Sequence, residues 1–292
     1  MTTSAAARVA VRAHAKVNLW LRVIAREEGG YHSIETLFHR LELADDVMVS
    51  LAPAGQRSIE CSVDVCPPGE NLAFRAAELY CTTQAWDTGF HIGIAKRIPA
   101  AGGLGGGSAD AAATLLALNA LSPRPCSDAD LSELGARLGA DVPFLLTGAA
   151  SALAWGHGDR LLELPALPQM WVALVIPPFG ISTAESYRSA PIGETRASSL
   201  TMSDLTGWAS VARRAGNDLS RSLPALRQGG LDRAATILRE AGAILAGMTG
   251  SGSVVFGVFE SEPESLPLES ATGWKVIVTR TALGVEAPSR LD

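Results

Sequence analysis

Pro99-Ala100-Ala101-Gly102-Gly103-Leu104-Gly105-Gly106-Gly107-Ser108-Ala109-Asp110 is the stretch of sequence that decides the fold of this chain. Residues 90–98 before it are typical of a strand, and the alanine- and leucine-rich residues 111–119 after it are typical of a helix. Its five glycines let the backbone approach a ligand closely. The helix N-terminus adds unpaired N–H donors and the positive end of the helix dipole. The stretch therefore predicts a binding site for a polyanion, in particular a nucleotide triphosphate.

Two better-known glycine-rich motifs do not fit this stretch. A P-loop requires a lysine after its last glycine, whereas Gly107 is followed by Ser108. The dinucleotide fingerprint Gly-x-Gly-x-x-Gly fails in both registers, because Ser108 or Asp110 stands where its third glycine belongs. A flexible loop without a ligand is the alternative. Ordering five glycines between a strand and a helix costs considerable conformational entropy, which favours the phosphate-binding interpretation.

Length and composition indicate a globular protein of one large domain or two ordinary ones. The chain has 292 residues, of which 47% are hydrophobic and 18% charged, so it can bury a substantial core. The composition changes near residue 160, after which prolines interrupt the sequence. We therefore predict an N-terminal domain over residues 1–160, which contains the glycine-rich stretch, and a C-terminal domain over residues 161–292.

Charge and hydropathy argue against several classes of partner. The formal net charge is −6 and no cluster of lysine and arginine offsets it, which argues against nucleic acid. No run of about 18 apolar residues is present, which argues against a membrane span. The four cysteines lack the spacing of metal or redox motifs, so reduced thiols are expected at Cys61, Cys66, Cys81 and Cys126. We expect a cytoplasmic protein that acts on a small molecule.

Periodicity predicts strands and helices in both halves of the chain. Residues 9–23 alternate between apolar and polar side chains, which is typical of one long or bent strand with a buried face. Further strands are expected over residues 47–51, 59–65, 90–98, 170–176, 254–259 and 274–279. Helices are expected over residues 71–85, 108–119, 127–138, 205–226 and 231–241. Because strands and helices do not alternate strictly, the predicted class is α+β.

Two charged residues are candidates for chemistry. Lys16 shares one face of the first predicted strand with His14 and Asn18, although a solvated lysine on a half-exposed sheet is the simpler interpretation. Asp141 lies between a helix and Pro143 and could be merely the N-cap of a short helix. As functional residues, the carboxylate would orient or deprotonate a hydroxyl while the lysine steadies the developing charge.

Two further segments are candidates for ligand contacts. Gly247-Met-Thr-Gly-Ser-Gly252 has more glycines and hydroxyls than a simple turn needs, so a second backbone contact to phosphate or substrate competes with the turn interpretation. Tyr31 and His32 could stack on a flat base and hydrogen-bond to it, whereas a surface turn is the simpler alternative. Lys96 lies on an apolar stripe just before the glycine-rich stretch.

The order of these segments resembles the GHMP kinase superfamily. The resemblance rests on Ala15-Lys-Val-Asn-Leu19, Gly30-Tyr-His32, Pro99 through Ala109, Gly139-Ala-Asp-Val-Pro143 and Thr249-Gly-Ser-Gly252. It runs from about Ala13 to Phe259. Within the superfamily it is similar to the kinases of isoprenoid biosynthesis that act on an alcohol carrying a cytidine diphosphate group. It implies a two-domain α+β fold with the active site in the cleft between the domains, in which residues 1–160 form the ATP-binding domain and residues 161–292 the substrate-side domain.

The resemblance also implies a role for each matching residue. Lys16 and Asp141 would be the catalytic pair. ATP would be bound by Pro99, Ala100, Ala101, Gly102, Gly103, Leu104, Gly105, Gly106, Gly107, Ser108 and Ala109, with Asn71 and Lys96 near the nucleotide. The substrate would be bound by Asn18, Tyr31, His32, Tyr187, Thr249 and Gly250. Gly107 stands where other GHMP kinases have a metal-binding serine and Ala109 where close relatives have a second serine, so Mg²⁺ is expected as a cofactor with no protein ligand named.

Other functions of the same fold remain open. The chain could phosphorylate homoserine or a mevalonate-type alcohol, but an aliphatic substrate leaves the base-stacking pair Tyr31 and His32 without a role. A nucleotide-binding sensor without catalysis is a third possibility. Because a sensor needs neither Lys16 nor Asp141, the presence of both favours a kinase.

Overall fold

Two β-sheets organise the chain, of which the computed structural model describes residues 7–28, 30–63, 66–188, 190–192, 200–264, 266 and 273–291. The first sheet has eight strands and the second has four. Five strands of the first sheet follow one another in space: β12 (Ser289–Leu291), β1 (Arg8–Arg26), β2 (His32–Ala52), β4 (Gly89–Ala95) and β3 (Arg57–Cys61). Of its other strands, β5 (Ser151–Gly156) pairs with β2 and with β6 (Arg160–Leu164), and β8 (Gly216–Asn217) pairs with β1. The second runs β11 (Lys275–Arg280), β7 (Trp171–Ile176), β10 (Val255–Phe259) and β9 (Leu245–Met248).

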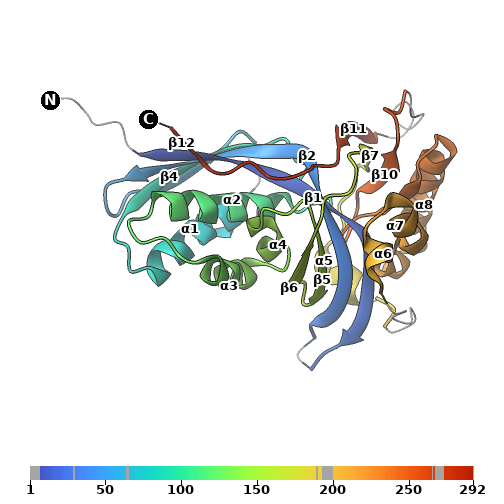
Figure 1. Cartoon of the computed structure of the whole chain (residues 1–292), viewed down its shortest axis with the longest axis horizontal. Helices are drawn as coiled ribbons and strands as arrows, with labels where there is room; N and C mark the ends of the chain where they lie inside the picture. The colour runs from blue at the N-terminus through green and yellow to red at the C-terminus, as the bar shows by residue number, and fades with distance from the viewer. Residues whose placement is uncertain are drawn as a thin grey trace.

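Helices gather on each sheet separately, so the chain has the predicted α+β architecture (Figure 1). On the first sheet lie α1 (Leu72–Thr83), α2 (Gly106–Leu121), α3 (Asp128–Leu138) and α4 (Val142–Leu146). The second sheet carries α8 (Ala225–Glu240). Shorter helices are α5 (Thr183–Arg188), α6 (Met202–Leu205) and α7 (Trp208–Arg214), with 3-10 turns η1 (Pro68–Glu70) and η2 (Asp218–Ser222).

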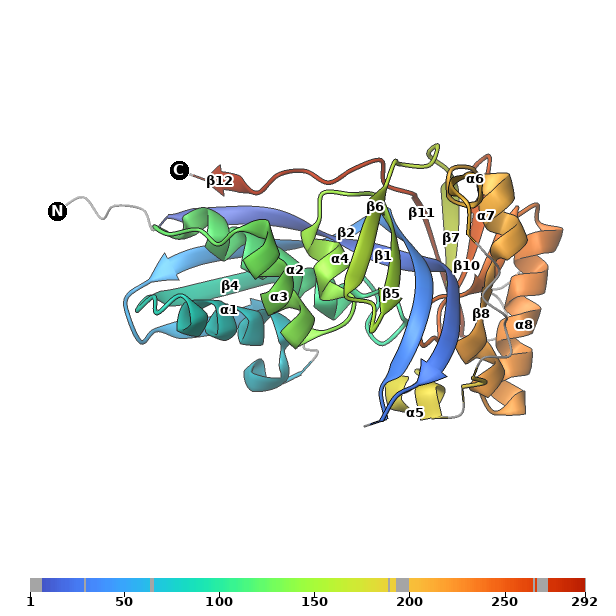
Figure 2. The ribbon, with the colours of Figure 1, turned by 60° about the horizontal axis from the view of Figure 1, so that its bottom comes forward.

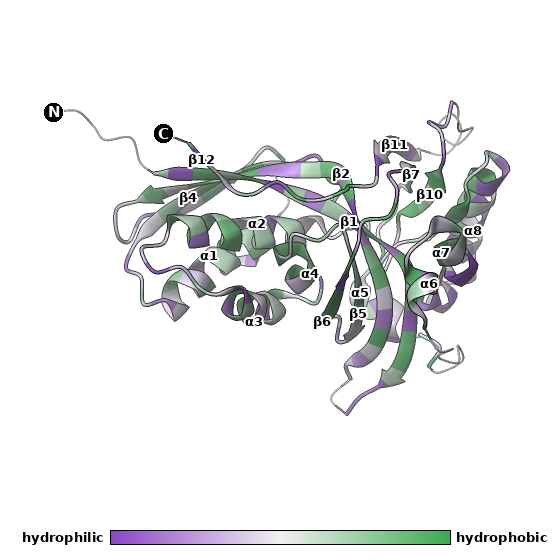
Figure 3. Ribbon diagram, in the orientation of Figure 1, coloured by the Kyte–Doolittle hydropathy of each residue, from purple (hydrophilic) through white to green (hydrophobic). Residues whose placement is uncertain are grey.

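The predicted strand over residues 9–23 is confirmed as β1, but its middle is buried on both faces. Every residue from Ala13 to Leu21 is buried, because α2 and its neighbours cover one part of the strand and the C-terminal segments cover another. The pairing with β2 shifts register between His14 and Lys16, and His14 turns its Nδ1 to Leu41 O at 2.8 Å. Figure 3 shows hydrophobic and hydrophilic positions interspersed along both strands of the β1–β2 hairpin.

Other expected strands have different ends in the structure. The strand expected over 47–51 is only the end of β2, which begins at His32. The strand expected over 90–98 is β4 and ends at Ala95, because Asp45 Oδ1 accepts hydrogen bonds from Arg97 N and Ile98 N in place of a strand partner. The strand expected over 59–65 ends at Cys61, and its last two positions lie outside the described residues.

Some of the predicted helices agree with the structure and others do not. The first three are α1, α2 and α3, and the Ser127 cap of α3 is confirmed as a capping box with Asp130. The continuous helical stretch expected over 205–226 is wrong: it contains α7, the short strand β8 and a 3-10 turn. The helix expected over 231–241 belongs to the longer α8.

Two observations bear on the protein's surroundings. In the part of the chain that the structure describes, no helix is long and apolar enough to cross a bilayer. All four cysteines are free thiols. The division of the chain at residue 160 stays a prediction.

Candidate active site

A cavity of about 600 Å³ brings together residues from distant parts of the sequence. It lies among β1, the glycine-rich stretch, the end of α3, the start of α5 and the loop after β9. Of the predicted site residues, it is lined by Lys16, Asn18, Asn71, Lys96, every position from Pro99 to Ser108, Asp141, Tyr187 and Gly250. Tyr31, His32, Ala109 and Thr249 do not line it.

The glycine-rich stretch forms a loop that leads into α2. Gly105 is the N-cap of α2 and has a left-handed φ of 73°. Lys16 N donates to Leu104 O at 3.0 Å, so the loop is fastened to β1. On the other side Val254 N donates to Gly102 O at 3.1 Å. The first backbone N–H groups of α2, which have no partner within the helix, therefore face the cavity from a fixed position.

A second loop, after β9, packs tightly against the first. A Cβ added at Gly103 would lie 2.3 Å from Thr249 O, and one added at Gly250 would lie 2.8 Å from Gly103 O. Both residues also have positive φ values, 79° and 56°. The two loops can therefore approach this closely only with glycine at both positions.

Asn217 holds the second loop and was missed by sequence analysis. Its Nδ2 donates to Met248 O at 2.9 Å and to Gly250 O at 2.8 Å. Nothing in the local sequence marks this role, because Asn217 lies 31 residues before the loop it fixes.

Lys16 and Asp141 form an ion pair in the wall of the cavity. Lys16 Nζ lies 3.2 Å from Asp141 Oδ2, and Lys16 is buried while the Asp141 side chain is 29% exposed. Asp141 occupies the N-cap position of α4, but its side chain makes no capping hydrogen bond. The Asp141 carboxylate therefore pairs with Lys16 and is open to the cavity, and it does not cap α4.

A chain of hydrogen bonds orients the Lys16 ammonium. Lys16 Nζ donates to Asn18 Oδ1 at 2.8 Å, and Asn18 Nδ2 donates to Thr36 Oγ1 at 2.8 Å. Thr36 in turn donates to Trp20 O at 2.6 Å. Asn18 N also donates to Thr249 Oγ1 at 2.9 Å, which accounts for Thr249 behind the cavity wall. Thr36 was missed by sequence analysis, because it belongs to the part of β2 that was not predicted.

His32 lies beside Tyr187, which lines the cavity. The His32 ring lies 5.2 Å from the Tyr187 ring, so the tip of the β1–β2 hairpin meets α5 there, as Figure 2 shows. Burial, with the Arg26 charge adding to it, lowers the pKa of His32. Burial raises the pKa of the Tyr187 phenol, and Asp141 raises it further. A neutral imidazole and a protonated phenol can both offer hydrogen bonds to a base.

Tyr31 differs from its neighbour His32 because it points outward. It is 68% exposed, and its ring stacks on His157 at 5.3 Å. His157, to which sequence analysis gave no role, also lies 2.9 Å from Glu27 Oε2. One face of the Tyr31 ring is thus supported by the protein.

The remaining polar candidates lie where β4 leads into the glycine loop. Lys96 Nζ lies 2.5 Å from Asp45 Oδ2 and 2.6 Å from Asp110 Oδ2. Asn71 Oδ1 accepts from Ala73 N at 2.9 Å and so caps α1. Asn71 therefore has a structural role as well as its place in the cavity wall.

The described side chains do not form a metal site by themselves. Among the described residues no group of three or more His, Cys, Asp or Glu side chains could hold a metal ion. Gly107 has no side chain to offer. The donor set therefore does not fit a resident metal held by the protein alone.

Comparison with known proteins gives the family. Residues 71–149 match the GHMP kinases N-terminal domain, and residues 210–268 match the GHMP kinases C-terminal domain. A 4-diphosphocytidyl-2-C-methyl-D-erythritol kinase from Citrifermentans bemidjiense is 35% identical over 274 residues, which cover 92% of this chain and 97% of that protein. One from Pelotomaculum thermopropionicum is 40% identical over 282 residues, covering 92% and 96%.

Solved structures agree with these relatives. The crystal structure of a 4-(cytidine 5'-diphospho)-2C-methyl-D-erythritol kinase matches with a TM-score of 0.75 and 35% identity, over 93% of this chain and 98% of that one. A homoserine kinase from Cytophaga hutchinsonii shares the fold, with a TM-score of 0.68 at 17% identity, over 100% and 99% of the two chains. With both GHMP domains present and 35% to 40% identity across nearly the full length of its relatives, this chain belongs to the 4-diphosphocytidyl-2-C-methyl-D-erythritol kinase family of GHMP kinases.

Proposed function

We propose that this protein transfers the γ-phosphoryl group of ATP to the 2-hydroxyl of 4-diphosphocytidyl-2-C-methyl-D-erythritol, a step of the non-mevalonate isoprenoid pathway. The observation that carries this proposal is the position of the ion pair beside the glycine loop. A Cβ added at Gly105 would lie 3.1 Å from Lys16 Cε and 3.6 Å from Asp141 Oδ2. A phosphate bound at the loop and a hydroxyl bound at the ion pair are therefore neighbours. The names of the relatives support the choice of substrate.

The residues from Pro99 to Ala109, with Asn71 and Lys96, would hold ATP. The backbone N–H groups at the start of α2 would bind the phosphates, with help from the helix dipole. Mg²⁺ is expected to arrive with the nucleotide, because it keeps most of its ligands as phosphate oxygens and water. When bound it would neutralise phosphate charge.

The ion pair would act on the acceptor hydroxyl. Asp141 would accept or orient the hydroxyl proton, since its carboxylate is open to the cavity. Lys16 would favour the deprotonated oxygen by its positive charge. Its ammonium is held by Asn18 and Asp141 and lies 5.4 Å from the centre of the Phe38 ring, so it cannot swing away from the acceptor. Fixed charges of this kind supply most of the catalysis in phosphoryl transfer.

The cytidine end of the substrate would lie at the mouth of the cavity. His32 and Tyr187 come from separate elements whose rings meet, and Tyr31, the residue before His32, offers a large exposed ring. Thr249 and Gly250 would close the substrate side through the loop after β9. A cytosine base can stack on an aromatic ring and hydrogen-bond through its edge.

One assay tests the proposed function against its alternatives. ADP release would be measured with the diphosphocytidyl alcohol, homoserine and mevalonate at equal concentrations. We expect activity with the first and at least about 100-fold less with the others, because a site built for a base leaves polar groups unpaired with an aliphatic alcohol. Activity with homoserine or mevalonate alone would overturn the substrate. ATP binding with no turnover of any of them would favour a sensor.

The Tyr31→Ala variant should weaken binding of the cytidyl substrate specifically. Aromatic stacking on a base is worth about 1–3 kcal/mol, so we expect the KM for this substrate to rise about tenfold or more. The KM for ATP should stay within about twofold. Steady-state kinetics with each substrate varied in turn measures both. Tyr31→Phe is the matched control, because it keeps the ring and should keep the wild-type KM; equal changes for both substrates would contradict the assignment.

A further inference from the structure

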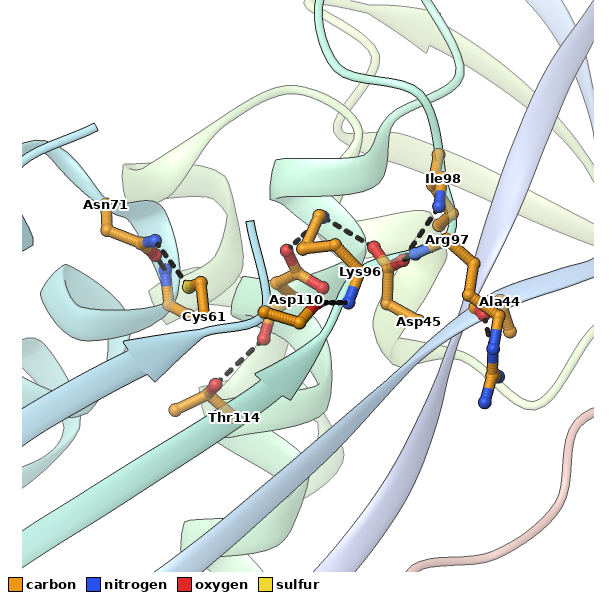
Figure 4. Close-up of polar contacts among 11 residues, drawn as sticks. Ala44, Asp45, Cys61, Asn71, Lys96, Arg97, Ile98, Asp110 and Thr114 are labelled. Carbon is orange, nitrogen blue, oxygen red and sulfur yellow. Dashed lines mark hydrogen bonds and ion pairs between the residues drawn. The ribbon is translucent and has the colours of Figure 1, made fainter. Parts of the chain in front are cut away.

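Three charged side chains meet in the interior beside the glycine loop, as Figure 4 shows. Asp45 belongs to β2, Lys96 follows β4 and Asp110 lies in α2. Lys96 Nζ lies 2.5 Å from Asp45 Oδ2 and 2.6 Å from Asp110 Oδ2. At most a tenth of any of the three side chains is exposed. We call these three residues the carboxylate–lysine cluster.

The free energy of folding gives little reason to bury this cluster, because removing its three charged groups from water is unfavourable. Two carboxylates face one ammonium, so the cluster carries a net negative charge unless one carboxyl group is protonated. Burial raises the pKa of Asp110 to about 7, although Lys96 opposes this shift. Among the described residues, Asp110 Oδ1 has no hydrogen-bond partner. A buried ion pair with an unsatisfied oxygen contributes little or nothing to stability compared with apolar packing.

The cluster instead fixes the backbone that enters the glycine loop. Asp45 Oδ1 accepts from Arg97 N at 2.5 Å and from Ile98 N at 2.8 Å, directly before Pro99. These two bonds end β4 and turn the chain towards the loop.

The start of α2 rests on the same segment. A Cβ added at Gly106 would lie 3.1 Å from Ile98 Cγ2 and 3.6 Å from Lys96 Nζ. Asp110, one turn further along α2, is tied to Lys96. Lys96 thus joins the entry of the loop to its exit, and both ends of the phosphate-binding backbone depend on it.

We infer that Asp45 and Asp110, acting through Lys96, are positioning residues for ATP, which hold the glycine loop in its phosphate-binding shape. This inference rests on the proposed use of the loop for ATP. Both carboxylates pair with Lys96 and not with Lys16, although Asp110 also lines the cavity. Their loss should therefore weaken ATP binding and leave binding of the alcohol substrate intact.

Asp45→Asn is the first test. Asparagine cannot offer oxygens to both the Arg97 and Ile98 N–H groups and the Lys96 ammonium, because one of its two terminal atoms is a donor. We expect the Kd for ATP, measured by calorimetry without acceptor, to rise about tenfold, the effect of losing one hydrogen bond to a charged group. The KM for the diphosphocytidyl alcohol should stay within about twofold.

Asp46→Asn is the matched control. Asp46 is the next residue, and it pairs with the exposed Arg97 guanidinium at 2.5 Å. The chemical change is the same, but among the described residues the Asp46 carboxylate pairs with the Arg97 side chain and not with Lys96. Its Kd for ATP should equal that of the wild type.

A second pair of variants covers the case in which Asp45→Asn does not fold. Asp110→Ala removes one partner of Lys96 and should also raise the Kd for ATP about tenfold. Asp110→Asn keeps an acceptor for Lys96 and matches the protonated carboxyl in shape, so it should restore the Kd to within about threefold of the wild type.

The outcomes separate this inference from the proposed function. Wild-type ATP affinity in folded Asp45→Asn and Asp110→Ala proteins would overturn the inference and leave the kinase proposal standing. Equal losses for ATP and for the alcohol, together with a lower Tm, would show a merely structural cluster and overturn it too. A wild-type protein that does not bind ATP would overturn both. Activity with a different alcohol would remove only the proposed acceptor.

Discussion

Asp141→Asn should lower kcat by about 100-fold or more, with little change in the KM of either substrate or in the free energy of unfolding. The amide keeps the size and shape of the carboxylate but cannot accept the hydroxyl proton. It also removes the negative charge 3.2 Å from Lys16 Nζ. Measurement of kcat by ADP release and of the Tm by thermal unfolding checks both parts.

This variant separates catalysis from helix capping. Asparagine caps a helix about as well as aspartate, so a residue that only capped α4 would tolerate the change. The structure already shows no capping hydrogen bond from the Asp141 side chain. Asp128→Asn is a suitable control, since Asp128 is an exposed acid in the first turn of α3 and should not affect kcat. A fully active Asp141→Asn enzyme would remove Asp141 from the mechanism.

Lys16 should act as one unit with Asp141. Lys16→Ala is expected to lower kcat to a similar degree, and the double variant should be little worse than either single one, because both residues serve one proton transfer. Lys16→Met fills the buried volume and separates loss of charge from loss of packing. Multiplicative losses in the double variant would show that the two residues act independently.

The parts of the site that could be predicted are those whose signal lies in a short stretch of sequence. The run of glycines marked the loop, and the capping box at Ser127 marked α3. Lys16 and Asp141 were chosen from their local settings and from the resemblance, and the structure places their charged groups 3.2 Å apart. Their catalytic roles stay predictions until the variants are measured.

The parts that could not be predicted depend on contacts between distant residues. Asp45 binds Ile98 N across 53 positions, just after the end of β4, and Asn18 binds Thr249 across 231 positions. No local pattern marks such partners. Most of β2 was missed because the apolar and polar residues of its buried middle, from Thr36 to Leu41, do not alternate as those of a half-buried strand do.

Gly105→Val should weaken ATP binding about 100-fold while the protein remains folded. Gly105 has a φ of 73°, a conformation that a β-branched residue adopts only with strain of about 1–3 kcal/mol. Its Cβ would also lie 3.1 Å from both Cγ and Cε of Lys16, so the valine methyl groups would press on the buried lysine. The expected loss combines a displaced phosphate loop with a displaced ammonium.

Gly148→Val supplies the control for this change. Gly148 lies between α4 and β5, and a Cβ added there meets nothing within 4 Å. It should bind ATP as the wild type does, so that a loss confined to Gly105→Val reports on the loop and not on glycine replacement in general. Because calorimetry with ATP alone needs no acceptor, the result is independent of which alcohol the enzyme phosphorylates. Wild-type ATP affinity in a folded Gly105→Val protein would remove the glycine loop from the nucleotide site.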